Sequence, residues 1–103
     1  MAEYTLELLQ PAWKELDAIA KMHLDLVGPV SAQQITDKIL DTLELLKTEP
    51  LMGKNCDDLG AVFVGLRKVV CGNYLCFYKI IDSKIYVYHI VDGRTDYPHI
   101  FES

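Results

Sequence analysis

Hydrophobic and polar residues alternate at the start of the chain and then take up a helical period. In residues 3–9 every second residue is apolar, which predicts a short strand with one buried face. Apolar residues between Ala12 and Val27 then recur at helical spacing, after Pro11, a residue that suits the first turn of a helix. Gly28-Pro29 ends this predicted helix.

A second helical pattern begins at Ser31. Ser31 and Gln34 are spaced as a capping box, in which each side chain accepts from an exposed backbone N–H of the first turn. We expect the helix to end near Lys47 or Thr48, before Pro50. Because the link between the two helices is short, they should pack as an antiparallel hairpin.

The rest of the chain predicts a loop and a three-stranded antiparallel meander. The loop is rich in Gly, Asn and Asp, and two-residue turns separate the later strands. The predicted segments are the loop Leu51–Gly60, a strand Val62–Val70, the turn Gly72-Asn73, a strand Tyr74–Ile81, the turn Asp82-Ser83 and a strand Lys84–Val91. The sequence therefore predicts one α+β domain over residues 1–103, with a short N-terminal strand and a helical hairpin on one face of the meander.

Two-residue turns fix the register, so that cross-strand partners can be counted. We expect Val69 opposite Cys76, Tyr78 opposite Val87, and Cys76 opposite His89. The face expected beneath the helices holds Arg67, Val69, Cys71, Tyr74, Cys76, Tyr78, Ile80, Ile85, Val87, His89 and Val91. The other face, expected to be partly open, basic and aromatic, holds Leu66, Lys68, Val70, Leu75, Phe77, Lys79, Ile81, Lys84, Tyr86, Tyr88 and Ile90.

Two expectations follow from this register. Arg67 lies on the covered face and should form an ion pair with an acidic residue of the helices, whereas Lys68 should meet an outside partner. Cys71 and Cys76 are not opposite each other, so no disulfide is expected between them.

Composition narrows the class of protein. The chain of 103 residues allows one core, no apolar run is long enough to cross a membrane, and Met1-Ala2-Glu3 does not begin a signal peptide. Three cysteines fit neither a secreted disulfide framework nor a zinc motif. We expect a cytoplasmic protein with reduced thiols.

Charge argues against strong, free-standing nucleic-acid binding. The net charge is −5, with four lysines against nine acidic residues in residues 1–53 and six basic against six acidic residues in residues 54–103. Nucleic-acid binders usually carry a basic excess, because phosphate neutralisation supplies most of their affinity. This chain has no such excess.

The tail from Asp92 to Phe101 gathers candidate functional residues. Arg94, Tyr97 and His99 follow the last predicted strand, although Arg94 can equally pair with a neighbouring aspartate and pin the tail. A metal site would have to combine His89, His99, Asp92 and Asp96. Since His89 is expected to face the helices, we name no metal, and we expect no cofactor. A lone helix histidine such as His23 is usually packing, and we assign it no role.

The order of these pieces resembles one known superfamily. The pieces are Trp13-Lys14-Glu15-Leu16 with Ile19-Ala20, Pro50-Leu51-Met52-Gly53, Leu66-Arg67 with Gly72-Asn73-Tyr74 and Tyr78, and Ile90-Val91-Asp92-Gly93-Arg94-Thr95-Asp96-Tyr97. Together with the predicted strand, helical hairpin and meander, they resemble the RelE/ParE superfamily of toxins from bacterial type II toxin–antitoxin systems. The resemblance covers nearly the whole chain.

The resemblance implies a target and an inhibitor. RelE-like toxins enter the ribosome and cut mRNA, ParE-like toxins poison DNA gyrase, and in both groups an antitoxin wraps the toxin. A ribonuclease of this kind needs cations at the scissile phosphate and an acid–base group. By resemblance, Lys68 and Arg94 match two such cations, and Tyr97 or His99 the acid–base group. Leu75, however, follows Tyr74 where the ribonucleases carry an arginine.

Three hypotheses therefore stand. The first is a ribosome-dependent mRNA endoribonuclease that uses Lys68, Lys79, Arg94, Tyr97 and His99. The second, which the missing arginine and the tail favour, is a ParE-like toxin that binds gyrase or another protein. The third is an inactive relative that serves only as a binding module. In each case we expect a cognate antitoxin on the open face, which holds Phe77, Lys79, Tyr86 and Tyr88. The sequence predicts neither an antitoxin sequence nor an oligomeric state, although a homodimer or a toxin–antitoxin hetero-oligomer fits the family.

Overall fold

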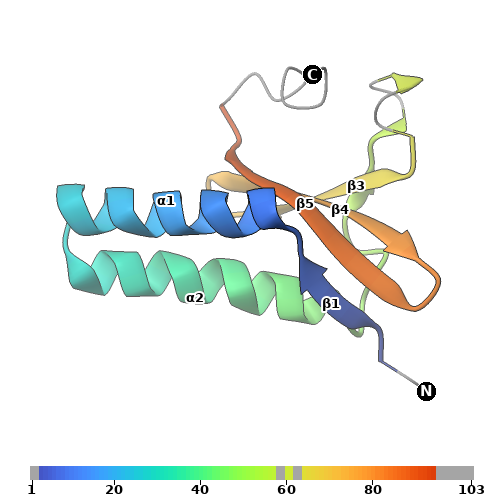
Figure 1. Ribbon diagram of the computed structural model, residues 1–103, viewed down its shortest axis with the longest axis horizontal. Coiled ribbons are helices and arrows are strands. Elements are labelled where there is room, and N and C mark those ends of the chain that lie inside the picture. Colours follow the sequence, from blue (N-terminus) through green and yellow to red (C-terminus); the bar gives the residue numbers. More distant parts are fainter. Residues whose placement is uncertain (1–2, 58–59, 62–63, 95–103) are drawn as a thin grey trace.

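Two helices pack against one layer of β-sheet in the computed structural model, which describes residues 3–57, 60–61 and 64–94 (Figure 1). The elements are β1 (Thr5–Leu8), α1 (Gln10–Leu26), α2 (Pro29–Leu45), β2 (Lys54–Asn55), β3 (Leu66–Cys71), β4 (Tyr74–Ile81) and β5 (Lys84–Asp92). The expected α+β fold, with an N-terminal strand, a helical hairpin and a C-terminal meander, is confirmed.

The sheet has more strands than the sequence predicts. Its order is β1-β5-β4-β3-β2, and β1 lies parallel to β5, with Leu6 beside Ile85. At the other edge, Lys54 and Asn55 pair with Lys68 and Arg67, within a segment expected to be loop. A two-residue strand carries no periodicity, which is why the sequence does not reveal β2.

The start of α2 corrects the expected capping box. Gly28 is the N-cap residue, with φ of 131°, and no side chain caps the helix. Pro29 takes the first helical position, where its missing N–H would have no partner within the helix. Ser31 lies inside the first turn, and its Oγ is 3.1 Å from Nδ1 of His23. The helix also ends at Leu45, two residues before the earliest expected end.

The main core lies between the helices and the sheet. Leu16 and Ile19 of α1 and Ile39 and Leu43 of α2 are buried against the same face of the sheet. The strands contribute Val69, Cys71, Tyr74, Cys76, Tyr78, Ile85, Val87 and Ile90. Each large apolar side chain buried here stabilises the fold by about 1.5–3 kcal/mol, so this layer holds the meander on the helices.

Both predicted hairpin turns are present, but a bulge changes the register of the last strand. Val69 pairs with Cys76 and Tyr78 with Val87, as expected. Beyond that point the register shifts, so that Phe77 pairs with His89 and Cys76 with Ile90.

The expected Cys76–His89 pair is therefore wrong. Tyr88 is the extra residue of a β-bulge, which two-residue turns alone cannot predict. As a result, Ile90 joins the main core, and Val91 joins a second cluster on the other face with Cys56, Leu66 and Phe77. These assignments reverse the faces expected for Ile90 and Val91.

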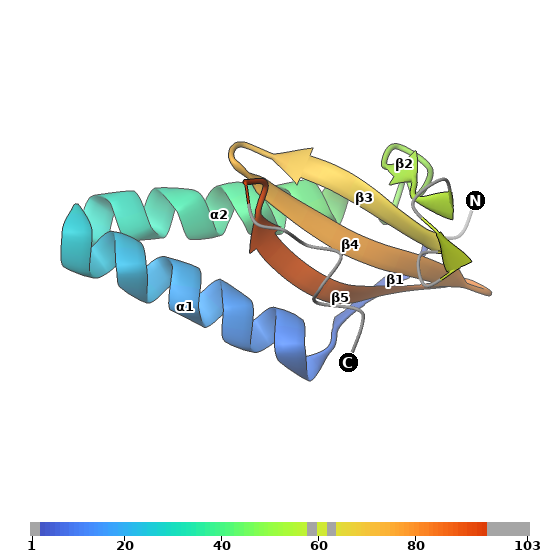
Figure 2. The ribbon, with the colours of Figure 1, turned by 90° about the horizontal axis from the view of Figure 1, so that it is seen from above.

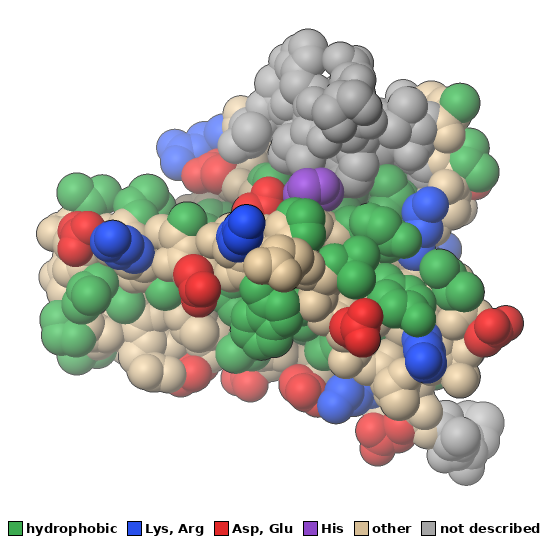
Figure 3. Space-filling view, viewed as in Figure 1, with side chains coloured by type: hydrophobic (Ala, Val, Ile, Leu, Met, Phe, Trp, Pro, Cys, Tyr) green, Lys and Arg blue, Asp and Glu red, His purple; other side chains and the backbone are tan. Residues whose placement is uncertain are grey.

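The helical hairpin projects beyond the sheet, as the view from above shows (Figure 2). At its end, hydrophobic side chains gather on the surface, seen at the left of Figure 3. Around the link between α1 and α2, at this end of the hairpin, Leu26, Val27 and Val30 are exposed by 78%, 71% and 69%. Neither helix of the described chain has the length and apolar character needed to cross a bilayer.

Candidate functional site

The loop before β2 is fixed by two side chains from the sheet. The Tyr78 hydroxyl accepts from the Gly53 N–H at 3.1 Å and donates to the Pro50 carbonyl at 2.7 Å. Arg67 Nη2 donates to the carbonyls of Gly53 (2.7 Å) and Leu51 (3.1 Å). The expected ion pair between Arg67 and a helix acid is therefore wrong. Its guanidinium holds the loop instead, and its buried Nε has no partner among the described residues.

Gly53 is required by this close packing. A Cβ at that position would lie 2.7 Å from the Lys68 carbonyl oxygen and 2.5 Å from the Tyr78 hydroxyl. The loop can therefore approach β3 closely enough to place Lys54 directly opposite Lys68. Two lysines thus lie side by side at this edge, beside a hollow of about 720 Å³ that also contacts Leu45, Met52 and Val70.

The second face of the sheet is less open than expected. Phe77 is fully buried in the second cluster, so the expectation of Phe77 on an open surface is wrong. Lys79, Tyr86 and Tyr88 are half-buried, and the Lys79 ammonium lies 5.6 Å from the centre of the Tyr88 ring. A cation at that distance from an aromatic face is attracted to it. These three side chains form a basic and aromatic strip on β4 and β5.

At the end of β5, Arg94 folds back onto Asp92. The Arg94 guanidinium donates from Nε (3.1 Å) and Nη2 (3.0 Å) to the Asp92 carboxylate, which also accepts from the Arg94 backbone N–H. These hydrogen bonds lower the pKa of Asp92 to about 2 and raise that of Arg94. The predicted pairing of Arg94 with a neighbouring aspartate is thus present, with Asp92 as the partner.

Lys68 and Arg94 do not share a hollow. Lys68 lines the hollow of about 720 Å³ beside Met52, whereas Arg94 lines a hollow of about 300 Å³ around the Gly72-Asn73 turn. Val70 and Leu75, paired across β3 and β4, line both hollows and lie between the two cations. Leu75 therefore places an apolar side chain where a ribonuclease would need a third cation. Tyr97 and His99, the expected acid–base groups, and the metal candidate Asp96 lie outside the described residues.

His23 has polar contacts that the sequence does not predict. Its Nε2 lies 3.2 Å from the Tyr74 hydroxyl, and its Nδ1 lies near Ser31, so that α1, α2 and β4 meet there. The pKa of Tyr74 is raised, first by burial and then by the nearby Asp92 carboxylate. The phenol therefore keeps its proton at neutral pH and remains a hydrogen-bond donor. The only sequence signal was a histidine near the apolar stripe of a helix.

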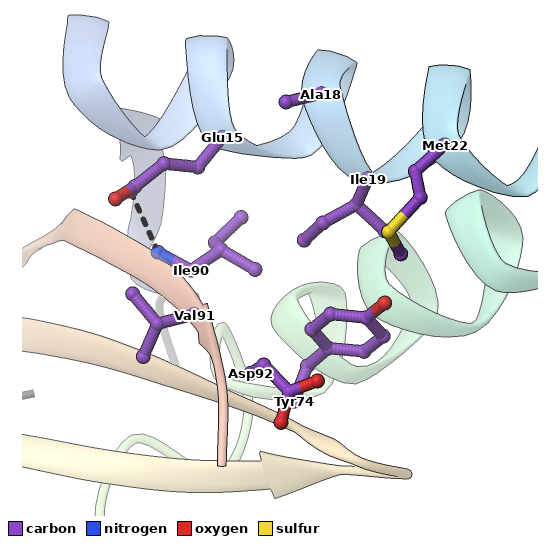
Figure 4. A pocket seen from close by; sticks show the side chains of 8 residues that line it. All are labelled: Glu15, Ala18, Ile19, Met22, Tyr74, Ile90, Val91 and Asp92. Atoms are coloured by element: carbon purple, nitrogen blue, oxygen red, sulfur yellow. Dashed lines mark hydrogen bonds between the residues drawn. The ribbon is translucent and has the colours of Figure 1, made fainter. Parts of the chain in front are cut away.

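Glu15 completes the free edge of β5. Beyond the part of β5 that pairs with β1, the Glu15 carboxylate accepts from the Ile90 N–H at 2.9 Å (Figure 4). The same carboxylate lies 3.1 Å from Nδ1 of His89. Next to it, a mostly apolar hollow of about 400 Å³ separates α1 from β5, and Ile19, Met22 and Tyr74 point toward it. His89 thus contacts a carboxylate of α1.

The cysteines fit the expectation of reduced, packed thiols. Cys56, Cys71 and Cys76 are all buried, and Cys71 and Cys76 are not bonded to each other. Burial raises the pKa of Cys76 to about 12. A thiol with such a pKa is a poor nucleophile at neutral pH, so Cys76 belongs to the core.

Comparison with known proteins identifies the relatives. A family model described as the ParE toxin of type II toxin–antitoxin system, parDE, matches residues 6–97. A chain of the chromosomal ParDE toxin–antitoxin system from P. aeruginosa has a similar structure, with a TM-score of 0.74, 18% identity, and coverage of 87% of this chain and 96% of that one.

A second similar structure comes from the RelBE2 toxin–antitoxin complex of Mycobacterium tuberculosis. Its TM-score is 0.66 at 19% identity, with coverage of 87% of this chain and 98% of that one. At these identities the two structures show a shared fold. A search of the curated proteins finds no match.

Proposed function

Since the chain belongs to the ParE toxin family of type II toxin–antitoxin systems, we propose that it arrests growth by binding a protein target, with DNA gyrase as the first candidate. We further propose that a cognate antitoxin holds it inactive. Both named structures of similar fold come from toxin–antitoxin systems, which supports an antitoxin partner. No chemical step on RNA is part of this proposal.

One observation carries the choice of a protein target. The Val70–Leu75 pair lies between Lys68 and Arg94, and Arg94 is already engaged by both carboxylate oxygens of Asp92. Phosphoryl chemistry needs several cations converging on one phosphate, because the transition state carries additional negative charge. Two separated cations with leucine and valine between them do not supply this arrangement. The net charge of −5 also opposes binding to ribosomal RNA.

The ribonuclease remains the second candidate because of Lys54 and Lys68. These residues face each other beside the hollow of about 720 Å³, and two neighbouring ammonium groups suit a phosphate ligand. Lys54 was not among the residues that the sequence singled out. An RNA-cleaving toxin would have to build its site around these two lysines.

Induced expression in a bacterial host tests the proposal. Expression of this chain alone should stop growth, and expression together with the antitoxin gene beside it should restore growth. For a gyrase target, the arrested cells should become filaments and switch on the DNA-damage response. In vitro, the purified toxin should reduce the supercoiling activity of gyrase. Growth that continues unchanged without the antitoxin would contradict toxicity altogether and favour a binding module.

Lys68→Ala provides a matched comparison of the two candidates. The ribonuclease mechanism would lose most of its toxicity with this change, because the lysine would contact the scissile phosphate. A toxin that needs no phosphate contact should still arrest growth at a similar expression level. Lys84→Ala, an exposed lysine at the start of β5, is the control for the loss of one positive charge.

A further inference from the structure

A further hollow lies where the helical hairpin meets the sheet. Its volume is about 450 Å³, and α2 contributes Lys38 while β4 and the end of β5 contribute Tyr74 and Arg94. Met22 and Ile35 form an apolar part of its wall. This site lies away from Lys68, which lines a different hollow.

Charge in this hollow is not balanced by the described residues. Asp92 is occupied by Arg94, so these two groups cancel. Lys38 forms no ion pair within the described part of the chain. The carboxylate of the preceding residue, Asp37, accepts instead from Gln33 at 2.8 Å. One positive charge therefore remains, which matches one carboxylate better than a doubly charged phosphate.

The donors around the hollow are placed for an acceptor. A Cβ at Gly72 would lie 3.4 Å from the Lys38 ammonium nitrogen, so glycine leaves that group accessible. Arg94 has five N–H donors, of which Asp92 takes two, and its side chain is 87% exposed. The Tyr74 hydroxyl lies at the same place, 3.2 Å from Nε2 of His23. The apolar wall adds room for the carbon chain that bears the acid.

From this geometry we infer that the hollow accepts an acidic side chain of the antitoxin, with Lys38 as its principal ion-pair partner and Arg94 as a further donor. This inference rests on the proposed antitoxin partner. The bound segment should carry an aspartate or glutamate next to an apolar residue. The acid would then meet the cationic side chains of the hollow, and the apolar residue would cover its apolar wall. Lys38 thereby contributes to neutralisation of the toxin and not to its toxicity.

Affinity measurements with single-charge variants test this inference. Purified toxin carrying Lys38→Gln should bind the antitoxin about tenfold more weakly than wild type, because a charge pair covered at an interface is lost. Lys21→Gln, an exposed lysine on α1, removes the same charge outside the hollow and should bind as wild type does. Both variants should stop growth when expressed alone.

A charge exchange identifies the partner group. Lys38→Glu should weaken binding more than Lys38→Gln, and replacing the matching antitoxin acid with lysine should recover the lost affinity. Equal affinities for wild type, Lys38→Gln and Lys21→Gln would overturn the inference and leave the antitoxin partner intact. If the wild-type toxin itself did not bind the antitoxin, the proposed function would fail together with this inference.

Discussion

Removing the hydroxyl of Tyr78 should destabilise the protein through the loop that it holds. The change Tyr78→Phe keeps the buried ring in place but removes one acceptor and one donor. The Gly53 N–H then loses its partner at 3.1 Å, and the Pro50 carbonyl loses its donor at 2.7 Å. Tyr78 is fully buried, and Gly53 is buried as well.

The magnitude follows from these two unpaired groups. Leaving a buried donor or acceptor without a partner costs about 1–3 kcal/mol. The Gly53 N–H should bear this cost in full, whereas Pro50 is only half-buried and its carbonyl can regain water. We therefore expect a loss of about 2 kcal/mol in the free energy of unfolding. For a domain of this size, that corresponds to a fall in Tm of roughly 8–16 °C.

Urea unfolding measures the loss in the free energy of unfolding, and amide hydrogen exchange measures the release of the Gly53 N–H. Tyr86→Phe is the matched control, because Tyr86 is half-buried and its side-chain hydroxyl makes no hydrogen bond among the described residues. It should change the free energy of unfolding by less than about 0.5 kcal/mol. In Tyr78→Phe, the Gly53 amide should also exchange faster than in wild type. Equal stabilities of the two variants would refute the view that this hydroxyl fixes the loop.

Two further predictions concern the C-terminal end of β5. Arg94→Ala should raise the pKa of Asp92 from about 2 toward 3.8, as measured by NMR titration of its carboxyl carbon, and an unchanged pKa would exclude Arg94 as the cause. Because the lowered pKa belongs to the folded state, the wild-type pair stabilises the fold above pH 3.8, and this contribution is lost as the pH falls toward 2. Glu15→Ala should cost about 1 kcal/mol, because the Ile90 N–H loses the carboxylate at 2.9 Å, and exchange of that amide should accelerate. Unchanged exchange at Ile90 would show that the edge of β5 does not depend on Glu15.

The local pattern of the sequence determines most of the fold. Alternation in residues 3–9, helical spacing in the next two segments and two-residue turns each depend on neighbours in the chain, and each is present in the structure. Apart from the capping box at Ser31 and the end of α2, what failed depends on distant contacts. The extra residue Tyr88 in β5 exchanges the faces of Ile90 and Val91, and no turn chemistry marks it.

The candidate site was harder to predict for the same reason. Arg67 was expected to pair with an acidic residue of the helices. The register predicted which face of the sheet carries Arg67, but it could not predict which segment packs against that side chain. The loop of Leu51 and Gly53 occupies that place instead. Lys38 and Lys54 carry no local motif, and only the packing of α2 and β2 brings them beside Arg94 and Lys68. The pairing of Arg94 with Asp92 was predictable, since the two residues are close in sequence.

The fate of mRNA in arrested cells tests the central claim most directly. Transcript ends should be mapped at the moment growth stops after induction of the toxin without antitoxin, with an uninduced culture as reference. A toxin that acts on a protein target predicts growth arrest with the same transcript ends in both cultures. New ends within translated codons, appearing before growth stops and absent in Lys68→Ala, would contradict this account and establish the ribonuclease.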